Sequence, residues 1–184
     1  MNIIFLDMDG VVNSKKSFYD LRKLFSSREK LNEYLCEDRG VPFYIDPSLR
    51  LRLNEILTKV PNCKVVWSTS WRLGLRDSKL FISGRYNTCG FNEGSFLDYT
   101  PINGNPRWMQ ILEWLNLKGN LYSIEKCIII DDDSDAEIPD IIDKNLKIIF
   151  QPIIEKYNPK FFQTNNEYGL SEDIKNDILN YFDK

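Results

Sequence analysis

The fold is decided by residues 3–11, IIFLDMDGV, close to the start of the chain. Four consecutive apolar residues are typical of a strand covered on both faces, because a half-exposed strand would alternate apolar and polar side chains. Asp7, Asp9 and Gly10 follow directly. Gly10 allows the chain to turn and a ligand to approach the backbone closely. The segment therefore predicts a buried strand with polar groups at its carboxyl end.

Three further short apolar runs predict strands, at residues 64–67, 127–130 and 146–150. Helical periodicity separates them, because apolar residues recur on one face at 49–57 and again at 108–115. Alternating strands and helices predict an α/β fold with a mostly parallel sheet and right-handed crossovers.

Two helix starts are marked by capping residues. Asn105 is expected to cap the second of these helices, with Pro106 at its first position. Ser171 is expected to cap an amphipathic helix that closes the chain.

The length of 184 residues suits one α/β domain with a core of its own. No repeat or linker divides the sequence, so we expect a single domain over residues 1–184. Residues 14–47 and 74–105 break the alternation and are expected to be insertions on the sheet. Insertions of this length are often lids or specificity loops.

Composition excludes several kinds of chemistry. The chain contains no histidine, which removes Ser-His-Asp and Cys-His catalysis and histidine-ligated zinc. Its four cysteines form no C-x-x-C pair and are expected to be core thiols in a reducing compartment. The net charge of −3 gives no global attraction to nucleic acid or to an anionic membrane.

Neither a signal peptide nor a membrane span is expected. The first apolar run stops at Asp7, and none approaches the ~20 residues that a bilayer-spanning helix needs. These features predict a cytoplasmic protein, although one exported without a cleaved signal would share them.

Polar side chains follow three of the predicted strands where each strand ends. Asp7 and Asp9 follow the first, residues 68–72 (STSWR) follow the second, and residues 131–133 (DDD) follow the third. The carboxyl ends of parallel strands meet at one edge of the sheet, where ligands bind in open α/β folds. We therefore expect these groups to converge on one crevice.

The converging carboxylates predict a site for Mg²⁺. Asp7, Asp9, Asp131 and Asp132 offer the hard oxygen ligands that this ion prefers. A cation would relieve their mutual repulsion, and it would neutralise a phosphoryl group approaching an anionic nucleophile. Taken alone, either acidic cluster could be an ordinary turn or helix start.

A calcium-binding loop beginning at Asp131 is excluded by its spacing. Ala136 stands where such a loop requires glycine, and Ile142 stands where it requires glutamate.

Hydroxyl and cationic side chains complete the expected site. Thr69 and Ser70 could donate hydrogen bonds to phosphoryl oxygens. Arg72 could grip a phosphate or a carboxylate, or form an internal ion pair. The candidates for a phosphate-binding cation are Arg107, preferred for its place at a helix start, and the alternatives Lys118 and Lys126.

This pattern resembles the haloacid dehalogenase (HAD) superfamily of phosphohydrolases. Members carry a strand ending in Asp-x-Asp-Gly, a strand ending in Thr or Ser, a downstream Lys or Arg, and an acidic pair after another strand. The matching residues are Asp7 with Asp9, Thr69, Arg107, and Asp131 with Asp132. Residues 66–72, 130–133 and 164–171 further resemble the HAD domain of "Swiss army knife" RNA repair proteins. The likeness extends over nearly the whole chain and implies a three-layer, Rossmann-like fold with residues 14–47 as a small cap-like insertion.

The resemblance also implies a mechanism. Asp7 would attack phosphorus to form an aspartyl-phosphate, and Asp9 would protonate the leaving oxygen and then activate water. Mg²⁺ would be held by Asp7, the backbone carbonyl of Asp9 and Asp132, with Asp131 in support. The remaining expected substrate contacts are Gly10, Ser70 and Arg72.

Two other classes of protein share part of this pattern. A signalling receiver domain also phosphorylates an Asp beside Mg²⁺, but it places that Asp in the middle of the domain and not on the first strand. A non-catalytic phosphate-binding module would need no acid at Asp9.

The expected substrate is a nucleotide or polynucleotide phosphate end, or else a phosphotyrosine protein. Aromatic residues between 81 and 99 could stack on its ring or simply pack on the core. They are Phe81, Tyr86, Phe91, Phe96 and Tyr99. The sequence predicts no oligomeric state.

Overall fold

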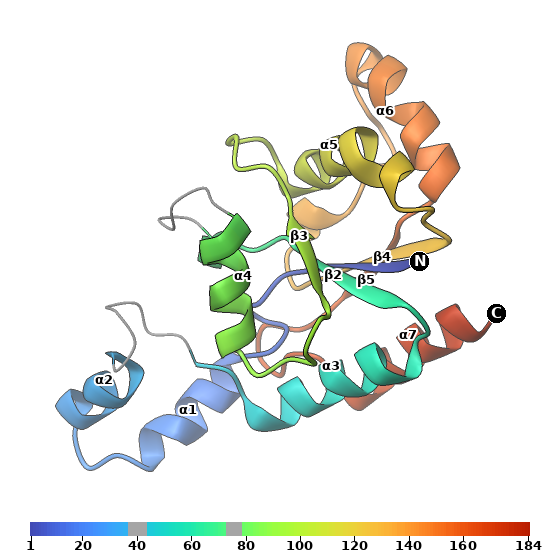
Figure 1. Ribbon diagram of the computed structural model, residues 1–184. Coiled ribbons are helices and arrows are strands. Elements are labelled where there is room, and N and C mark those ends of the chain that lie inside the picture. Colours follow the sequence, from blue (N-terminus) through green and yellow to red (C-terminus); the bar gives the residue numbers. More distant parts are fainter. Residues whose placement is uncertain (37–43, 73–78) are drawn as a thin grey trace.

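The computed structural model describes residues 1–36, 44–72 and 79–184. Its centre is a five-stranded parallel sheet in the order β3-β2-β1-β4-β5 (Figure 1). The strands are β1 (Asn2–Leu6), β2 (Cys63–Trp67), β3 (Phe96–Tyr99), β4 (Lys126–Asp131) and β5 (Lys160–Gln163). The predicted α/β class and parallel sheet are therefore confirmed.

Helices cover both faces of the sheet. The α-helices are α1 (Lys15–Lys23), α2 (Arg28–Cys36), α3 (Pro47–Lys59), α4 (Lys79–Thr88), α5 (Arg107–Lys118), α6 (Lys144–Tyr157) and α7 (Glu172–Asp183). Short 3-10 turns are η1 (Ser70–Arg72), η2 (Gly119–Leu121) and η3 (Ser134–Ala136). Among the described residues, no helix has both the length and the apolar character needed to cross a bilayer.

The alternating side chains of β1 divide the core into two layers. Ile4 and Leu6 pack with residues of α3, α4 and α7, such as Leu53. Ile3 and Phe5 point to the other face and pack with residues of α5 and α6. All five residues of β1 are buried, as a continuous apolar run predicts for a strand between two helical layers. This arrangement is the expected three-layer fold.

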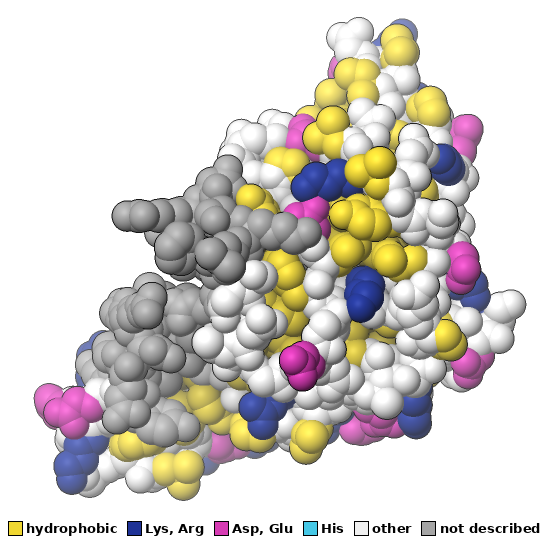
Figure 2. Space-filling model, in the orientation of Figure 1, with side chains coloured by type: hydrophobic (Ala, Val, Ile, Leu, Met, Phe, Trp, Pro, Cys, Tyr) yellow, Lys and Arg dark blue, Asp and Glu magenta, His cyan; other side chains and the backbone are white. Residues whose placement is uncertain are grey.

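One predicted strand is wrong. Residues 146–150 belong to α6, which begins after Asp143, whose side chain accepts a hydrogen bond from the backbone N–H of Asn145. Ile148 is 78% exposed, whereas Phe150, Ile153 and Tyr157 are buried at helical spacing. The short apolar run concealed this periodicity, and apolar side chains gather at the surface over α6 (Figure 2).

Two edge strands were missed. β3 and β5 have four residues each and are only partly buried, so their sequences carry too few apolar residues to resemble a buried strand. Residues 74–105, expected to be an insertion on the sheet, contain all of α4 as well as β3 (Figure 1), with residues 74–78 lying outside the described part. Residues 14–47 supply α1 and α2, with residues 37–43 lying outside the described part.

The expected helix starts fare differently. Ser171 caps α7 as expected, accepting a hydrogen bond from the backbone N–H of Ile174. Asn105 does not cap α5, because Pro106 occupies the cap position and makes no side-chain cap bond. The Asn105 side chain instead donates to Glu113, at 2.8 Å.

Candidate active site

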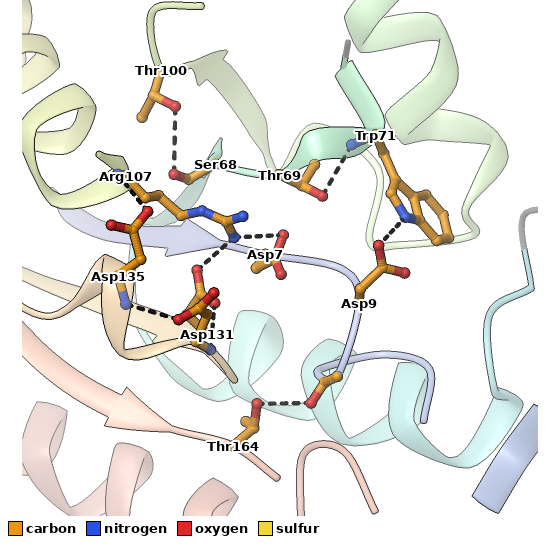
Figure 3. A network of polar contacts seen from close by, with 12 residues as sticks. Asp7, Asp9, Ser68, Thr69, Trp71, Thr100, Arg107, Asp131, Asp135 and Thr164 are labelled. Carbon is orange, nitrogen blue, oxygen red and sulfur yellow. Dashed lines mark hydrogen bonds and ion pairs between the residues drawn. The ribbon is translucent and has the colours of Figure 1, made fainter. Parts of the chain in front are cut away.

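The strand register brings three polar residues to the same level at one edge of the sheet. Leu6 of β1 pairs with Trp67 of β2 and with Ile130 of β4. The next residue along each chain segment is therefore level with the others, and these residues are Asp7, Ser68 and Asp131 (Figure 3). The three residues therefore lie together at the carboxyl ends of the strands, as expected for a parallel sheet.

Arg107 joins two of the carboxylates at this edge. Its Nη1 atom lies 2.9 Å from Oδ1 of Asp7 and donates a hydrogen bond of 2.7 Å to Oδ2 of Asp131 (Figure 3). Arg107 is the first residue of α5, and its backbone N–H donates to Asp135 in η3 at 3.1 Å. That contact fixes the start of the helix beside the end of β4.

Burial changes the protonation of these carboxylates. Desolvation raises the pKa of Asp7 to about 6, against the opposing effects of the Arg107 charge and a hydrogen bond with Thr69. Desolvation, together with the nearby charge of Asp7, raises the pKa of Asp131 to about 7. Burial also raises the pKa of Asp132. Burial of the site therefore opposes the ionisation of all three carboxyl groups.

Three carboxylates are close enough to share one ion. One oxygen from each of Asp7, Asp131 and Asp132 lies within 4.8 Å of the others. Arg107 compensates one charge, which leaves two negative charges uncompensated when all three are ionised. Oδ1 of Asp7 is buried and, among the described residues, accepts no hydrogen bond of normal geometry. A hard divalent cation fits this oxygen-only set in both charge and ligand type.

Gly10 lies directly against the Asp132 side chain. Its φ of +66° is a conformation that favours glycine, and a Cβ built at this position would lie 2.3 Å from Cγ of Asp132. The Gly10 carbonyl accepts a hydrogen bond of 2.7 Å from the Thr164 hydroxyl (Figure 3). The absence of a side chain at Gly10 therefore leaves the space that the Asp132 carboxylate occupies.

The hydroxyl residues after β2 face different surroundings. Thr69 is fully buried, interacts with Asp7, and accepts a hydrogen bond of 3.3 Å from the backbone N–H of Trp71. Ser68 is also buried and lies 3.4 Å from the Thr100 hydroxyl. Ser70 is exposed in η1. The backbone of Arg72 closes η1, but its side chain lies outside what the structure describes.

Asp9 lies apart from the three clustered carboxylates and is exposed. Its Oδ2 accepts a hydrogen bond of 2.9 Å from the indole N–H of Trp71, and its Oδ1 accepts one of 2.9 Å from the amide of Asn13. The carboxylate is thus held at the edge of the site (Figure 3).

The two alternative cations lie elsewhere. Lys118 pairs with the buried Asp98, at 2.5 Å. Lys126 begins β4, at the opposite end of the strand from Asp131, and donates to the carbonyls of Tyr181 and Phe182. Of the three candidate cations, Arg107 is the one that the structure places beside Asp7.

The aromatic residues between 81 and 99 mostly pack on the core. Tyr86 and Phe91 are buried in it, and Phe96 and Tyr99 pack against it. The side chain of Phe81 is not among those described.

Several residues of the site were missed in the sequence. Asn13 and Thr164 hold the turn at Gly10, since Asn13 accepts from the Gly10 N–H at 3.0 Å. Asp135 receives the N–H of Arg107. An Asn shortly after an Asp-Gly turn was a usable signal for Asn13, and Thr164 begins the segment 164–171 that resembles the family. Nothing local indicated Asp135.

The fold and the acidic, arginine-bridged site define a domain of the HAD type. The family model described as the HAD domain in Swiss Army Knife RNA repair proteins matches residues 3–174, and the chain belongs to this family. The family is one of phosphatase-type hydrolases, as the resemblance implied.

Two solved structures are similar in fold. The HAD domain of effector protein Lem4 from Legionella pneumophila matches with a TM-score of 0.52 and 16% identity, over 99% of this chain and 95% of that chain. An inactive mutant of the same domain matches with a TM-score of 0.52 and 15% identity, over 99% and 94%. At such low identity the likeness concerns the fold alone. No curated protein gave a significant match.

Proposed function

We propose that the chain is a magnesium-dependent phosphomonoester hydrolase with Asp7 as its nucleophile. One observation carries the proposal: the buried Asp7 carboxylate lies 2.9 Å from Arg107 and within 4.8 Å of two further carboxylates. The Asp7 carboxylate and a phosphoryl group are both negatively charged, so positive charge is needed beside each of them when they react. Arg107 and a metal ion held by the clustered carboxylates would supply that charge.

The residues then have distinct roles. Asp7 attacks phosphorus, the bond to the leaving oxygen breaks, and the phosphoryl group is carried on Asp7 until water removes it. Asp9 gives a proton to the leaving oxygen and later takes one from the attacking water. Arg107 and Thr69 hold the phosphoryl oxygens.

A divalent cation belongs to this scheme. Asp7, Asp131 and Asp132 would hold Mg²⁺, which supplies positive charge against the repulsion between the carboxylate and the phosphate. Asp9 would take part through its backbone carbonyl, because its carboxylate accepts hydrogen bonds from Trp71 and Asn13.

We further propose a nucleotide or a polynucleotide phosphate end as the substrate, since the family is described by its RNA repair proteins. A turnover screen with Mg²⁺ tests both proposals. It compares 3′- and 5′-phosphorylated oligonucleotides, mononucleotides and phosphotyrosine peptides, with Asp7→Asn as the matched inactive control. Release of phosphate from nucleotides or oligonucleotides by the wild type alone is expected. Preference for the peptides would overturn the substrate, and no hydrolysis of any would favour a non-catalytic binding module.

A further inference from the structure

Asp9 is held by two donors that come from different parts of the chain. The Trp71 indole N–H binds Oδ2 and the Asn13 amide binds Oδ1, each at 2.9 Å. Trp71 lies in η1, after β2, whereas Asn13 follows β1. Figure 3 shows the Trp71 indole and the Asp9 carboxylate pointing toward each other. We define Trp71 and Asn13 as the Asp9 clamp.

Both members of the clamp are themselves fixed. Trp71 is only 9% exposed and packs in the same core cluster as Met8 and Val12. Asn13 is 5% exposed, and its side-chain oxygen accepts the Gly10 N–H at 3.0 Å. Asp9 by contrast is exposed, so its carboxylate would sample several rotamers without such contacts. Rotation about its Cβ–Cγ bond breaks both hydrogen bonds at once.

We propose that Trp71, with Asn13, is a positioning residue that orients Asp9 for proton transfer to the leaving group. The inference rests on the proposed hydrolase function. In the first half of the reaction, Asp7 bonds to phosphorus, the phosphorus–oxygen bond breaks, and the leaving oxygen takes the proton of Asp9. Trp71 and Asn13 keep their protons throughout and touch neither the substrate nor the phosphoryl group. Their effect is to hold the Asp9 carboxyl group in position to donate its proton. This effect changes the rate only for substrates whose leaving oxygen needs a proton.

Leaving-group dependence separates this role from a structural one. Trp71→Phe keeps an aromatic ring in the core and removes the N–H donor. It also leaves intact the backbone N–H that binds Thr69. The probes are an alkyl phosphate, whose leaving oxygen needs a proton, and 2,4-dinitrophenyl phosphate, whose leaving group does not. The measured quantity is kcat/KM, because it reports the steps up to phosphoryl transfer and not the later hydrolysis at Asp7.

We expect Trp71→Phe to lower kcat/KM about 10-fold to 100-fold with the alkyl phosphate, because Asp9 gains negative charge as it gives up its proton and the missing N–H no longer stabilises that charge. With the dinitrophenyl ester we expect a change below about 3-fold. Trp114→Phe is the matched control, because it removes an indole hydrogen bond of 2.8 Å to the buried Asp98, away from the site. It should affect both substrates equally and only slightly. Equal losses with both substrates in Trp71→Phe would overturn the clamp.

A second measurement needs no turnover and no change in the core. The Trp71 indole N–H resonance should move upfield in Asp9→Ala, while those of Trp67 and Trp114 stay in place. An unchanged Trp71 resonance would overturn the clamp, whatever the activity. If the Trp71 resonance shifts in Asp9→Ala but the wild-type protein hydrolyses no substrate, the hydrogen bond between Trp71 and Asp9 is supported. The hydrolase function is then contradicted, and with it the catalytic role of the clamp.

Discussion

Nη1 of Arg107 lies 2.9 Å from Oδ1 of Asp7, which places a fixed cation against the residue proposed to attack phosphorus. The same nitrogen also holds Asp131, so one guanidinium organises two buried carboxylates. In the proposed function Arg107 also holds the phosphoryl oxygens, so substrate binding and the charge of the acidic site would be coupled through one side chain.

Replacement of Arg107 should separate its charge from its shape. Arg107→Met should lower kcat/KM by about 100-fold or more, because a donor to the developing charge is lost. Arg107→Lys should lose less, since an ammonium keeps the charge without the planar fork. Lys118→Met is the control, because Lys118 lies on the same helix and pairs with Asp98. Equal activity in Arg107→Met and Lys118→Met would contradict the assignment.

The buried carboxylates should make the metal-free protein less stable as the pH rises. Their folded-state pKa values, about 6 for Asp7 and about 7 for Asp131, lie above the ordinary value of 3.8. Between these values the folded state binds more protons than the unfolded state, so the free energy of unfolding falls as pH increases from about 4 to about 7.

Urea unfolding in EDTA checks this dependence. The double variant Asp7→Asn/Asp131→Asn lacks both titrating groups. The difference in free energy of unfolding between this variant and the wild type should therefore shift in favour of the variant as the pH rises through this window. A difference that stays constant with pH would count against the raised pKa values.

Magnesium should stabilise the protein through the three clustered carboxylates. At a hundredfold excess over its Kd a ligand adds about 2.7 kcal/mol, which for a chain of this size raises Tm by about 5–10 °C. Asp132→Asn should lose this response. Asp133→Asn should keep it, because Asp133 accepts the Asp135 N–H, as an Asn can also do. Thermal unfolding with and without Mg²⁺ distinguishes them, and loss of the response in both would refute the ligand set.

Gly10→Ala should damage the metal site more than the fold. Both Gly10 and Gly94 have positive φ, +66° and +72°, so an alanine at either costs about 1–2 kcal/mol of backbone strain. Only at Gly10 would the added Cβ meet the Asp132 carboxylate, since no atom of the described residues lies within 4 Å of a Cβ built at Gly94. Gly10→Ala should therefore lose the Mg²⁺-dependent rise in Tm and the activity, whereas Gly94→Ala should keep both.

The fold could be predicted wherever strands are buried on both faces. The runs that became β1, β2 and β4 are apolar at consecutive positions and lie in the middle of the sheet. β3 and β5 lie at its edges, where partly exposed strands accept polar residues and lose that signature. Residues 146–150 were wrongly predicted to be a strand, because the helical spacing of α6 can be recognised only when Ile153 and Tyr157 are included.

The site could be predicted as far as strand ends determine it. Asp7 and Asp131 follow from a parallel sheet, since equivalent positions of neighbouring strands meet at one edge. The contact between Trp71 and Asp9 spans 62 residues and depends on side-chain rotamers, so no local pattern contains it. The choice of Arg107 over Lys118 likewise depends on where α5 begins against η3.

Asp7 is proposed to carry the phosphoryl group during turnover, and trapping that group on the protein is the sharpest test of this role. Asp9→Asn should still accept a phosphoryl group from 2,4-dinitrophenyl phosphate, whose leaving group needs no acid, but should release it slowly. After acid quenching, peptide mass spectrometry should find one phosphoryl group on Asp7, and none in the variant that also carries Asp7→Asn. Turnover at the wild-type rate by Asp7→Asn, or a phosphoryl group on another residue, would contradict the assignment of Asp7 as the nucleophile.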